Sequence, residues 1–319
     1  ALLGAASKRE AIMPVVDYAA CRAGFRSWEL LPDDSSYPAS LLDLGKDAPI
    51  LRGYGDPDVL LGDCLSVIGA RKATPYGESC AKMAARVAAE SGITVVSGGA
   101  IGCDCVAGTA AVEAGGKTVV IPGCGADVVY PRSSEKLFCR ALETGGCVVS
   151  VEHWGCPPTR WTFLKRNRAI AALSRSLIVC EAGRPSGTFG TATQAADLGR
   201  RVYAIPGSIF SANSSGTNWL IESGAAIVVD EESLEALIAL DYGRLRMCGA
   251  SKHKERGVLL DALVANPMFP DEISHLIDLD LPSTLALLAE HEAMGLVTRL
   301  MDGRFAPTED SYLGQNVRH

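Results

Sequence analysis

Short apolar runs alternate with helical stretches through the middle of this 319-residue chain. Strands that alternate with helices form βαβ units, whose right-handed crossovers cover both faces of a parallel sheet. The pattern therefore predicts an α/β fold with a Rossmann-like, doubly wound, mostly parallel sheet. The expected strands are 65–69, 94–96, 117–121, 147–151, 176–180, 202–205 and 226–229, and the expected helices are 76–91, 103–114, 134–143 and 192–198.

The carboxyl ends of the expected strands are the first place to look for a ligand site. In open parallel sheets, ligands bind beyond the carboxyl ends of the strands. Most of these ends are loops of Gly, Ser and Pro, and the first carries two cations, Arg71 and Lys72. No strict GxGxxG motif follows the first strand, so the sequence does not support ordinary dinucleotide binding.

A basic segment precedes the strand at 176–180. No Asp or Glu lies between Glu152 and Glu181, although the whole chain has a net charge of −7. Fixed positive charges on a short segment attract anions, which favours phosphate binding. The alternative is a solvated helix face whose partners come from elsewhere in the fold. The five cations, which we expect to be uncompensated, are Arg160, Lys165, Arg166, Arg168 and Arg175.

The loop that follows this strand strengthens the phosphate interpretation. Residues 183–188 are turn formers, and a helix is expected from Ala192. A strand, a Gly/Ser/Thr loop and a helix start aim free backbone N–H groups at an anion. Ser186, Thr188 and Thr191 add hydroxyl groups, although helix capping alone could explain them.

Composition narrows the protein class. No run approaches the ~18 apolar residues of a membrane helix, and no secretory signal is visible, so we expect a cytoplasmic protein without a membrane partner. The eleven cysteines are scattered without a CxxC pair. They are expected to be buried, reduced thiols. The sequence predicts neither a cofactor nor a metal.

Five segments are expected along the chain. They are a helical or irregular lead-in (1–60), the Rossmann-like domain (61–240), a polar linker (241–255), a winged-helix domain (256–309) and a tail (310–319). The winged helix is predicted from three helices and a hairpin that turns at Asp302-Gly303. Residues 256–309 hold three Arg or Lys and nine Asp or Glu. Phosphate would repel such a unit, so a protein-contact or structural role is expected for it, not DNA reading.

At several motifs the chain resembles the DNA-processing protein A family, DprA or Smf. The resemblance implies a Rossmann-like fold, single-stranded DNA binding, a homodimer, and handover of DNA to a RecA-type recombinase in natural transformation. It implies no catalytic step. The similar segments, between about residues 36 and 230, are 67–74, 96–98, 102–104, 121–125, 130–131, 166–174, 181–182, 186–188, 206–207 and 216–218.

Two positions depart from the family pattern. The family usually has Arg where this chain has Ile101, and His where it has Gly108. The expectation is that the rim of the site lacks one cation and one polar group. This would either weaken its affinity for DNA or indicate that the lineage uses the protein outside transformation.

The DNA-binding hypothesis assigns roles to named residues. Trp161 and Phe163 are candidate base-stacking platforms, worth ~1–3 kcal/mol per base, although aromatic residues at such positions are more often core. Neighbours two apart on a helix point in different directions. One of Arg166 and Arg168 is therefore expected to contact DNA, with Arg166 preferred, and the other to pair with a buried acid, with Glu181 as the candidate. The expected phosphate-binding residues are Arg71, Lys72, Lys165, Arg166, Asn167, Arg168, Ser186, Gly187 and Thr188.

The alternative hypothesis is a nucleotide-binding or nucleoside-monophosphate phosphoribohydrolase-like enzyme on the same fold. Its GTxxE-like loop would correspond to residues 190–194, but Gln194 stands where a carboxylate is needed. An amide cannot act as a general base near neutral pH. Of the remaining carboxylates, Asp104 is expected to cap a helix and Glu181 to pair with an Arg. We therefore predict that the protein is not an enzyme.

Overall fold

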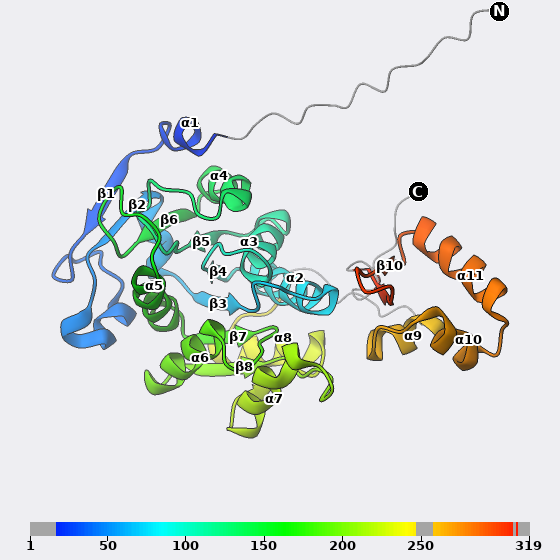
Figure 1. Ribbon diagram of the computed structural model, residues 1–319. Helices are drawn as coiled ribbons and strands as arrows, with labels where there is room; N and C mark the ends of the chain where they lie inside the picture. Colours follow the sequence, from blue (N-terminus) through cyan, green and yellow to red (C-terminus); the bar gives the residue numbers. More distant parts are fainter. Residues whose placement is uncertain (1–16, 247–257, 309–310, 312–319) are drawn as a thin grey trace, which may run out of the picture.

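The computed structural model describes residues 17–246, 258–308 and 311. Its main feature is a nine-stranded sheet with helices on both faces (Figure 1), in the order β1-β2-β6-β5-β4-β3-β7-β8-β9. All neighbouring pairs from β6 to β9 are parallel, which confirms the predicted mostly parallel α/β sheet. These strands are β3 (Cys64–Ile68), β4 (Thr94–Ser97), β5 (Thr118–Val120), β6 (Cys147–Ser150), β7 (Ser176–Val179), β8 (Arg201–Ala204) and β9 (Ala226–Ile227).

The chain changes direction across the sheet between β3 and β7. Strands β3 to β6 follow one another outward, and β7 then returns to pair with the free side of β3, with Ile68 opposite Val179. Such a switch point leaves a crevice outside the carboxyl ends of the two strands. The carboxyl ends of β3 and β7 therefore mark the most favourable place for a ligand.

The N-terminal segment is part of the same sheet. Strand β2 (Leu51–Gly55) pairs antiparallel with β6, and β1 (Ser27–Leu30) pairs antiparallel with β2. A strand near β2 was predicted from the sequence, whereas β1 was not, and both lie in the segment that was expected to be a lead-in. Of the segment before them, the short helix α1 (Tyr18–Arg22) is described, and residues 1–16 lie outside the described residues.

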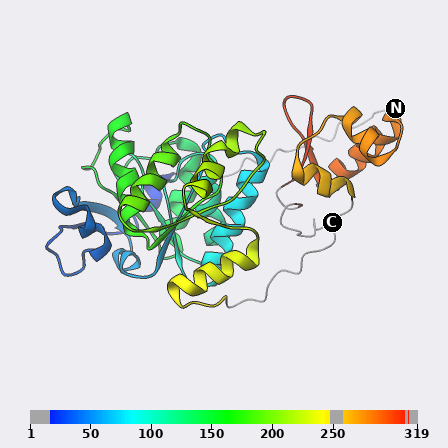
Figure 2. The ribbon, with the colours of Figure 1, turned by 90° about the horizontal axis from the view of Figure 1, so that it is seen from below.

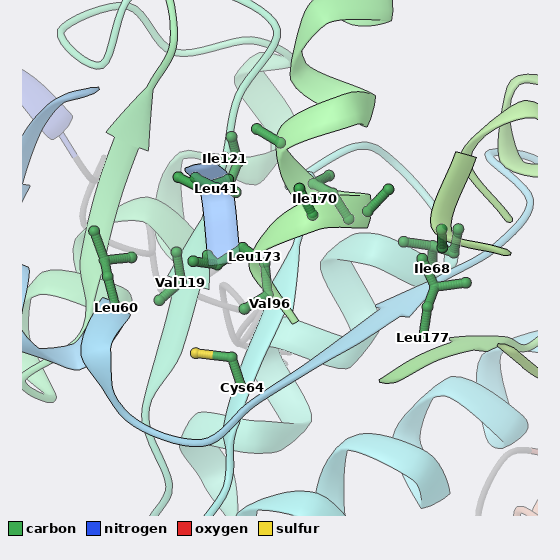
Figure 3. Packing of buried hydrophobic residues seen from close by; sticks show 14 of the residues in the cluster. Leu41, Leu60, Cys64, Ile68, Val96, Val119, Ile121, Ile170, Leu173 and Leu177 are labelled. Carbon is green, nitrogen blue, oxygen red and sulfur yellow. The ribbon is translucent and has the colours of Figure 1, made fainter. Parts of the chain in front are cut away.

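Alternate strand residues face two helical layers. Leu65 and Val67 of β3 pack under one layer, and Cys64 and Ile68 pack under the other, which is the period-two pattern of a strand buried on both faces. Figure 3 shows part of the apolar core that contains Cys64 and Ile68, in which Ile170 lies near the sheet. The first layer holds α2 (Pro75–Glu90), α3 (Cys103–Glu113) and α8 (Glu231–Tyr242), and the second holds α5 (Arg160–Leu173), α6 (Gly187–Asp197), α7 (Ser215–Glu222) and the 3-10 segment η1 (Ala39–Asp47).

Helix boundaries differ from the prediction in two informative places. Helix α6 begins at Gly187, five residues before the predicted start, because the Ser186 hydroxyl caps its first turn. Helix α8 lies beside α2 (Figure 2), and the sequence analysis did not identify it or α7. The remaining helix of the sheet domain, α4 (Glu135–Glu143), matches its prediction closely and packs against α1 and α3.

The predicted linker begins inside the folded part of the chain. Helix α8 ends at Tyr242, and Arg246 is buried in ion pairs with Glu90, Glu231 and Glu235. Residues 247–257 lie outside the described residues. The start of the linker is therefore fixed to the sheet domain by charge pairs that the sequence analysis missed.

The C-terminal segment has its own small core. Leu263, Ile273 and Leu288 are fully buried in it, together with Val297 and Phe305 of a hairpin. The order of elements agrees with the prediction for this segment, although its identification as a winged helix stays a prediction. No helix among the described residues is long and apolar enough to cross a membrane. The elements are α9 (Val258–Ala265), α10 (Pro270–Ile277), α11 (Leu281–Ala293), β10 (Val297–Arg299) and β11 (Phe305–Pro307).

Candidate functional site

A cavity of about 430 Å³ lies at the switch point between β3 and β7. Its walls come from the end of β3, the start of α3, the middle of α5 and the start of α6. This is the edge at which the sequence predicted a ligand site. The polar or glycine residues among its lining are Gly69, Arg71, Asp104, Arg166, Asn167, Gly183, Ser186, Gly187, Thr188 and Thr191.

The start of α6 forms one wall of the cavity. The Ser186 Oγ accepts a hydrogen bond from the backbone N–H of Phe189 at 3.2 Å. The Thr188 Oγ1 donates to the carbonyl of Gly69 at 2.9 Å, which ties the helix start to the end of β3. The N–H groups of Gly187 and Thr188 occupy the first two helical positions, where no intrahelical acceptor exists. These groups and the helix dipole favour an anion at this wall.

A buried arginine lies at the floor of the cavity. Arg166 is only 3% exposed, and its Nη1 donates to the carbonyl of Ile121 at 3.1 Å. The same nitrogen lies 3.7 Å from Asp104 Oδ2. A Cβ at residue 98 would come within 1.3 Å of Arg166 Nη1, so only glycine leaves room for the guanidinium there. The buried Nε of Arg166 makes no hydrogen bond with any described residue, so one donor of the guanidinium is without a partner.

Burial and charge oppose each other at the Arg166–Asp104 pair. Burial raises the pKa of Asp104, although Arg166 and hydrogen bonds from the backbone of Gly69 and Gly98 act against this. Burial also lowers the pKa of Arg166, and Asp104 counteracts that shift. Each charge therefore depends on the other, which fixes Arg166 at the floor of the site.

The predicted roles of two carboxylates are wrong. Glu181 forms no ion pair with an arginine of the described residues; it accepts hydrogen bonds from Thr74 N at 2.8 Å and Thr74 Oγ1 at 2.7 Å. Burial raises its pKa and these hydrogen bonds from Thr74 oppose the rise. Asp104 does not cap α3, because the N-cap position is Gly102. The buried acid that pairs with an arginine of α5 is therefore Asp104 and not Glu181. Asp104 is far from Arg166 in the sequence but close to it in the fold.

The basic segment is largely compensated, which corrects the prediction of five uncompensated cations. Lys165 lies 3.3 Å from Glu152, and Arg168 lies 2.9 Å from Asp47. Arg175 donates to the carbonyl of Asp241. Glu152 lies in the turn between β6 and α5, Asp47 lies in η1 and Asp241 lies in α8. Acceptors from three other parts of the chain therefore neutralise most of the segment. Lys165 and Arg168 nevertheless stay substantially exposed, at 65% and 44% of their side chains.

Arg71 and Phe163 form a connected pair at the rim. The Arg71 guanidinium lies 4.7 Å from the centre of the Phe163 ring, and Arg166 lies 5.6 Å from the same ring. A ring of this kind attracts cations through its π face. Phe163 also packs over Gly123, where a Cβ would come within 2.4 Å of it. Phe163 therefore positions both cations, whereas Trp161 is 74% exposed.

The cavity brings together six of the nine expected phosphate-binding residues. They are Arg71, Arg166, Asn167, Ser186, Gly187 and Thr188. Lys72, Lys165 and Arg168 do not line it. Arg184 was not among the predicted residues; it is exposed in the loop before α6 and lies 4.4 Å from the Trp219 ring and 5.3 Å from the Phe189 ring. Its place among the turn formers of residues 183–188 was the available signal.

The two departures from the family pattern have different surroundings. Ile101 is 54% exposed and follows Ala100, which lines the cavity. Gly108 instead lies buried in α3, where a Cβ would meet Leu137 Cδ1 at 2.9 Å. The expectation that both positions belong to the rim is therefore wrong for Gly108, because the helix turns it towards α4.

Comparisons with known proteins agree on one family. The model of the DNA recombination-mediator protein A family matches residues 28–239. Protein Smf of Escherichia coli strain K12 is 38% identical over 215 residues, which are 67% of this chain and 57% of that protein. The chain thus spans little more than half of the length of this relative.

Two solved structures are similar to this fold. DNA processing protein A from Streptococcus pneumoniae has a TM-score of 0.61 and 34% identity, over 68% of this chain and 76% of that one. DNA processing protein A from Helicobacter pylori, whose structure concerns a single-stranded DNA binding mode, has a TM-score of 0.61 and 28% identity, over 69% of this chain and 100% of that one.

Proposed function

This chain belongs to the DNA recombination-mediator protein A family, and we propose that it binds single-stranded DNA by holding backbone phosphate in the cavity between β3 and β7. The observation that carries the proposal is the convergence of three anion-binding features on one cavity. They are the start of α6, the buried Arg166 and the exposed Arg71. In this proposal these groups contact phosphate and not base edges, so binding is expected to tolerate any sequence.

The roles within the cavity follow from exposure. Arg166 and the N–H groups of Gly187 and Thr188 hold one phosphate at the floor, where fixed donors need little reordering. Arg71 contacts a neighbouring phosphate at the rim. Lys72, Lys165 and Arg168 act outside the cavity as exposed charges whose effect salt screens.

Stacking is assigned with the same reasoning. Trp161 is the more exposed of the two aromatic residues on the first turn of α5 and is the proposed platform for a base. One face of Phe163 is already covered by Arg71, so its proposed role is to hold that arginine. The proposal therefore retains Trp161 as a base-stacking residue and gives Phe163 a positioning role instead.

The biological setting of the proposal rests on family membership. We propose that a homodimer protects incoming single strands in the cytoplasm and passes them to a RecA-type recombinase during natural transformation. The ten cysteines among the described residues are free thiols, as expected in a reducing compartment. The C-terminal segment is proposed to be a winged helix with a protein-contact or structural role.

A binding function is favoured over a hydrolytic one because the two carboxylates near the cavity, Asp104 and Glu181, already have partners in the fold. Asp104 faces the cavity but is paired with Arg166, and Glu181 is held by Thr74. Gln194 lies on α6 and does not line the cavity. A general base must reach its substrate with a free carboxylate or imidazole. We therefore propose a binding function without a catalytic step.

The test compares two single cation deletions by fluorescence anisotropy with labelled single-stranded DNA. Arg71→Ala removes a rim contact and is expected to lower affinity by ~1–2 kcal/mol, about 5- to 30-fold. Its melting temperature should hardly change because the side chain is exposed. Lys136→Ala, an exposed cation on α4 away from the cavity, is the matched control and should bind as the wild type does. Equal affinities for all three proteins would place the site elsewhere.

A further inference from the structure

A second cluster of reactive side chains lies in the turn between β6 and α5, outside the cavity. Glu152, His153 and Cys156 bring a carboxylate oxygen, an imidazole nitrogen and a thiol sulfur within 4.8 Å of one another. No metal was predicted from the sequence because the cysteines lack a CxxC pair, whereas this set uses one cysteine and two other ligand types. We propose that these three side chains bind a transition metal ion, with zinc as the best match.

The backbone of the turn is fixed before any metal binds. Cys156 N donates to the carbonyl of His153 at 3.2 Å, and Gly125 N donates to the carbonyl of Cys156 at 2.9 Å. The Gly155 N–H lies 2.8 Å and 3.0 Å from the two carboxylate oxygens of Asp127, to which it donates. The backbone at His153 and Cys156 is therefore already held in place, which lowers the entropy lost when their side chains bind an ion.

The buried carboxylate of Glu152 is only loosely paired. Glu152 is 7% exposed, and its Oε1 accepts no hydrogen bond from the described residues. Lys165 Nζ lies 3.3 Å from Oε1 outside hydrogen-bonding geometry and donates to Oε2 at 3.5 Å. The Lys165 side chain is 65% exposed, so it can turn to solvent at little cost. A metal ion would satisfy the buried oxygen more completely than this loose ion pair does.

The donor set selects the class of ion. A thiolate, an imidazole and a carboxylate suit zinc, whereas magnesium and calcium prefer oxygen ligands alone. Zinc bonds of roughly 2.0–2.3 Å in a tetrahedron put ligand atoms about 3.4–3.6 Å apart. Ligand atoms that lie within 4.8 Å of one another need to approach by at most about 1.4 Å to reach that geometry. His153 is exposed, which provides an entry path and leaves the fourth position to water.

The test uses the full chain, freed of metal and titrated with Co²⁺. Cobalt bound to a thiolate gives a charge-transfer absorption band in the near ultraviolet. We expect one equivalent of Co²⁺ to produce the band and one equivalent of Zn²⁺ to remove it. Cys156→Ser should abolish the band and His153→Ala should weaken cobalt binding at least about tenfold. Cys105→Ser changes a half-buried cysteine outside the cluster and should leave the titration unchanged.

A second variant guards against a folding defect. Glu152→Gln keeps the thiol and the side-chain shape but removes the charge, and it should weaken cobalt binding. Circular dichroism of each variant establishes that it is folded. The absence of a charge-transfer band in the wild type overturns the proposal, as does a band that persists in folded Cys156→Ser. Unchanged affinity in both Glu152→Gln and His153→Ala also overturns it.

Discussion

Arg166→Ala tests the buried ion pair at the floor of the cavity. The substitution leaves Asp104 buried at 7% exposure without its cation and removes the donor to the Ile121 carbonyl. Breaking a buried pair by removing one partner costs about 3–5 kcal/mol. For a domain of this size the loss corresponds to a melting temperature lowered by roughly 6–20 °C. Single-strand affinity should fall as well, because the same guanidinium is a proposed phosphate contact.

Arg168→Ala is the matched control on the same helix. Its ion pair with Asp47 is about half exposed on both sides, so its loss should cost only about 0–1 kcal/mol. Melting followed by circular dichroism measures both variants. The reasoning also requires that Arg166→Ala/Asp104→Asn be more stable than Arg166→Ala, since the double variant has no uncompensated buried charge. Equal destabilisation by the two arginine substitutions, or no gain in the double variant, would refute it.

The pH dependence of Arg166→Ala gives a further check of the same pair. Burial already raises the pKa of Asp104, and removal of Arg166 takes away the largest influence that lowers it. A carboxyl with a folded-state pKa above its unfolded value of ~3.9 binds more protons in the folded state. The variant's stability must therefore fall as pH rises through the interval between these pKa values. The deficit relative to wild type should be smaller at mildly acidic pH than at neutral pH.

Two other predictions concern DNA affinity. Truncation after Arg246 keeps the buried ion pairs of that residue and removes the acidic C-terminal segment. Fluorescence anisotropy should therefore show nearly unchanged affinity for single-stranded DNA. A large loss of affinity in a folded truncated protein would contradict this. Ile101→Arg adds a cation beside the cavity and should tighten DNA binding by about threefold to tenfold at low salt, and this gain should shrink as the salt concentration rises. An unchanged or weaker affinity would show that residue 101 does not face the bound DNA.

The sheet and the edge that carries the site could be predicted from the sequence. Apolar runs such as 176–180 are buried on both faces, and parallel strands place their carboxyl ends at one edge. That rule alone brought Arg71 and the loop at 186–188 together, as the cavity lining shows. The start of α6 was missed because Gly and Thr favour turns, whereas Ser186 capping outweighs that preference.

The partners of the charges could not be predicted. Asp104 and Glu181 both stand near strand ends, and only side-chain packing decides which one meets Arg166. The space that Gly98 leaves for the guanidinium settles the choice. The pair between Arg168 and Asp47 spans 121 residues and depends on how η1 folds against α5. Such contacts form only in the assembled tertiary structure, and local sequence patterns do not reveal them.

The salt dependence of binding tests the central claim most directly. Wild-type protein is titrated with single- and double-stranded DNA of equal length at several salt concentrations. If the cavity and its rim hold several backbone phosphates of a single strand, the logarithm of affinity should fall linearly with the logarithm of salt, by ~0.7 per phosphate, and the single strand should bind more tightly. An affinity that ignores salt, or a preference for the duplex, would contradict phosphate binding at the β3–β7 cavity.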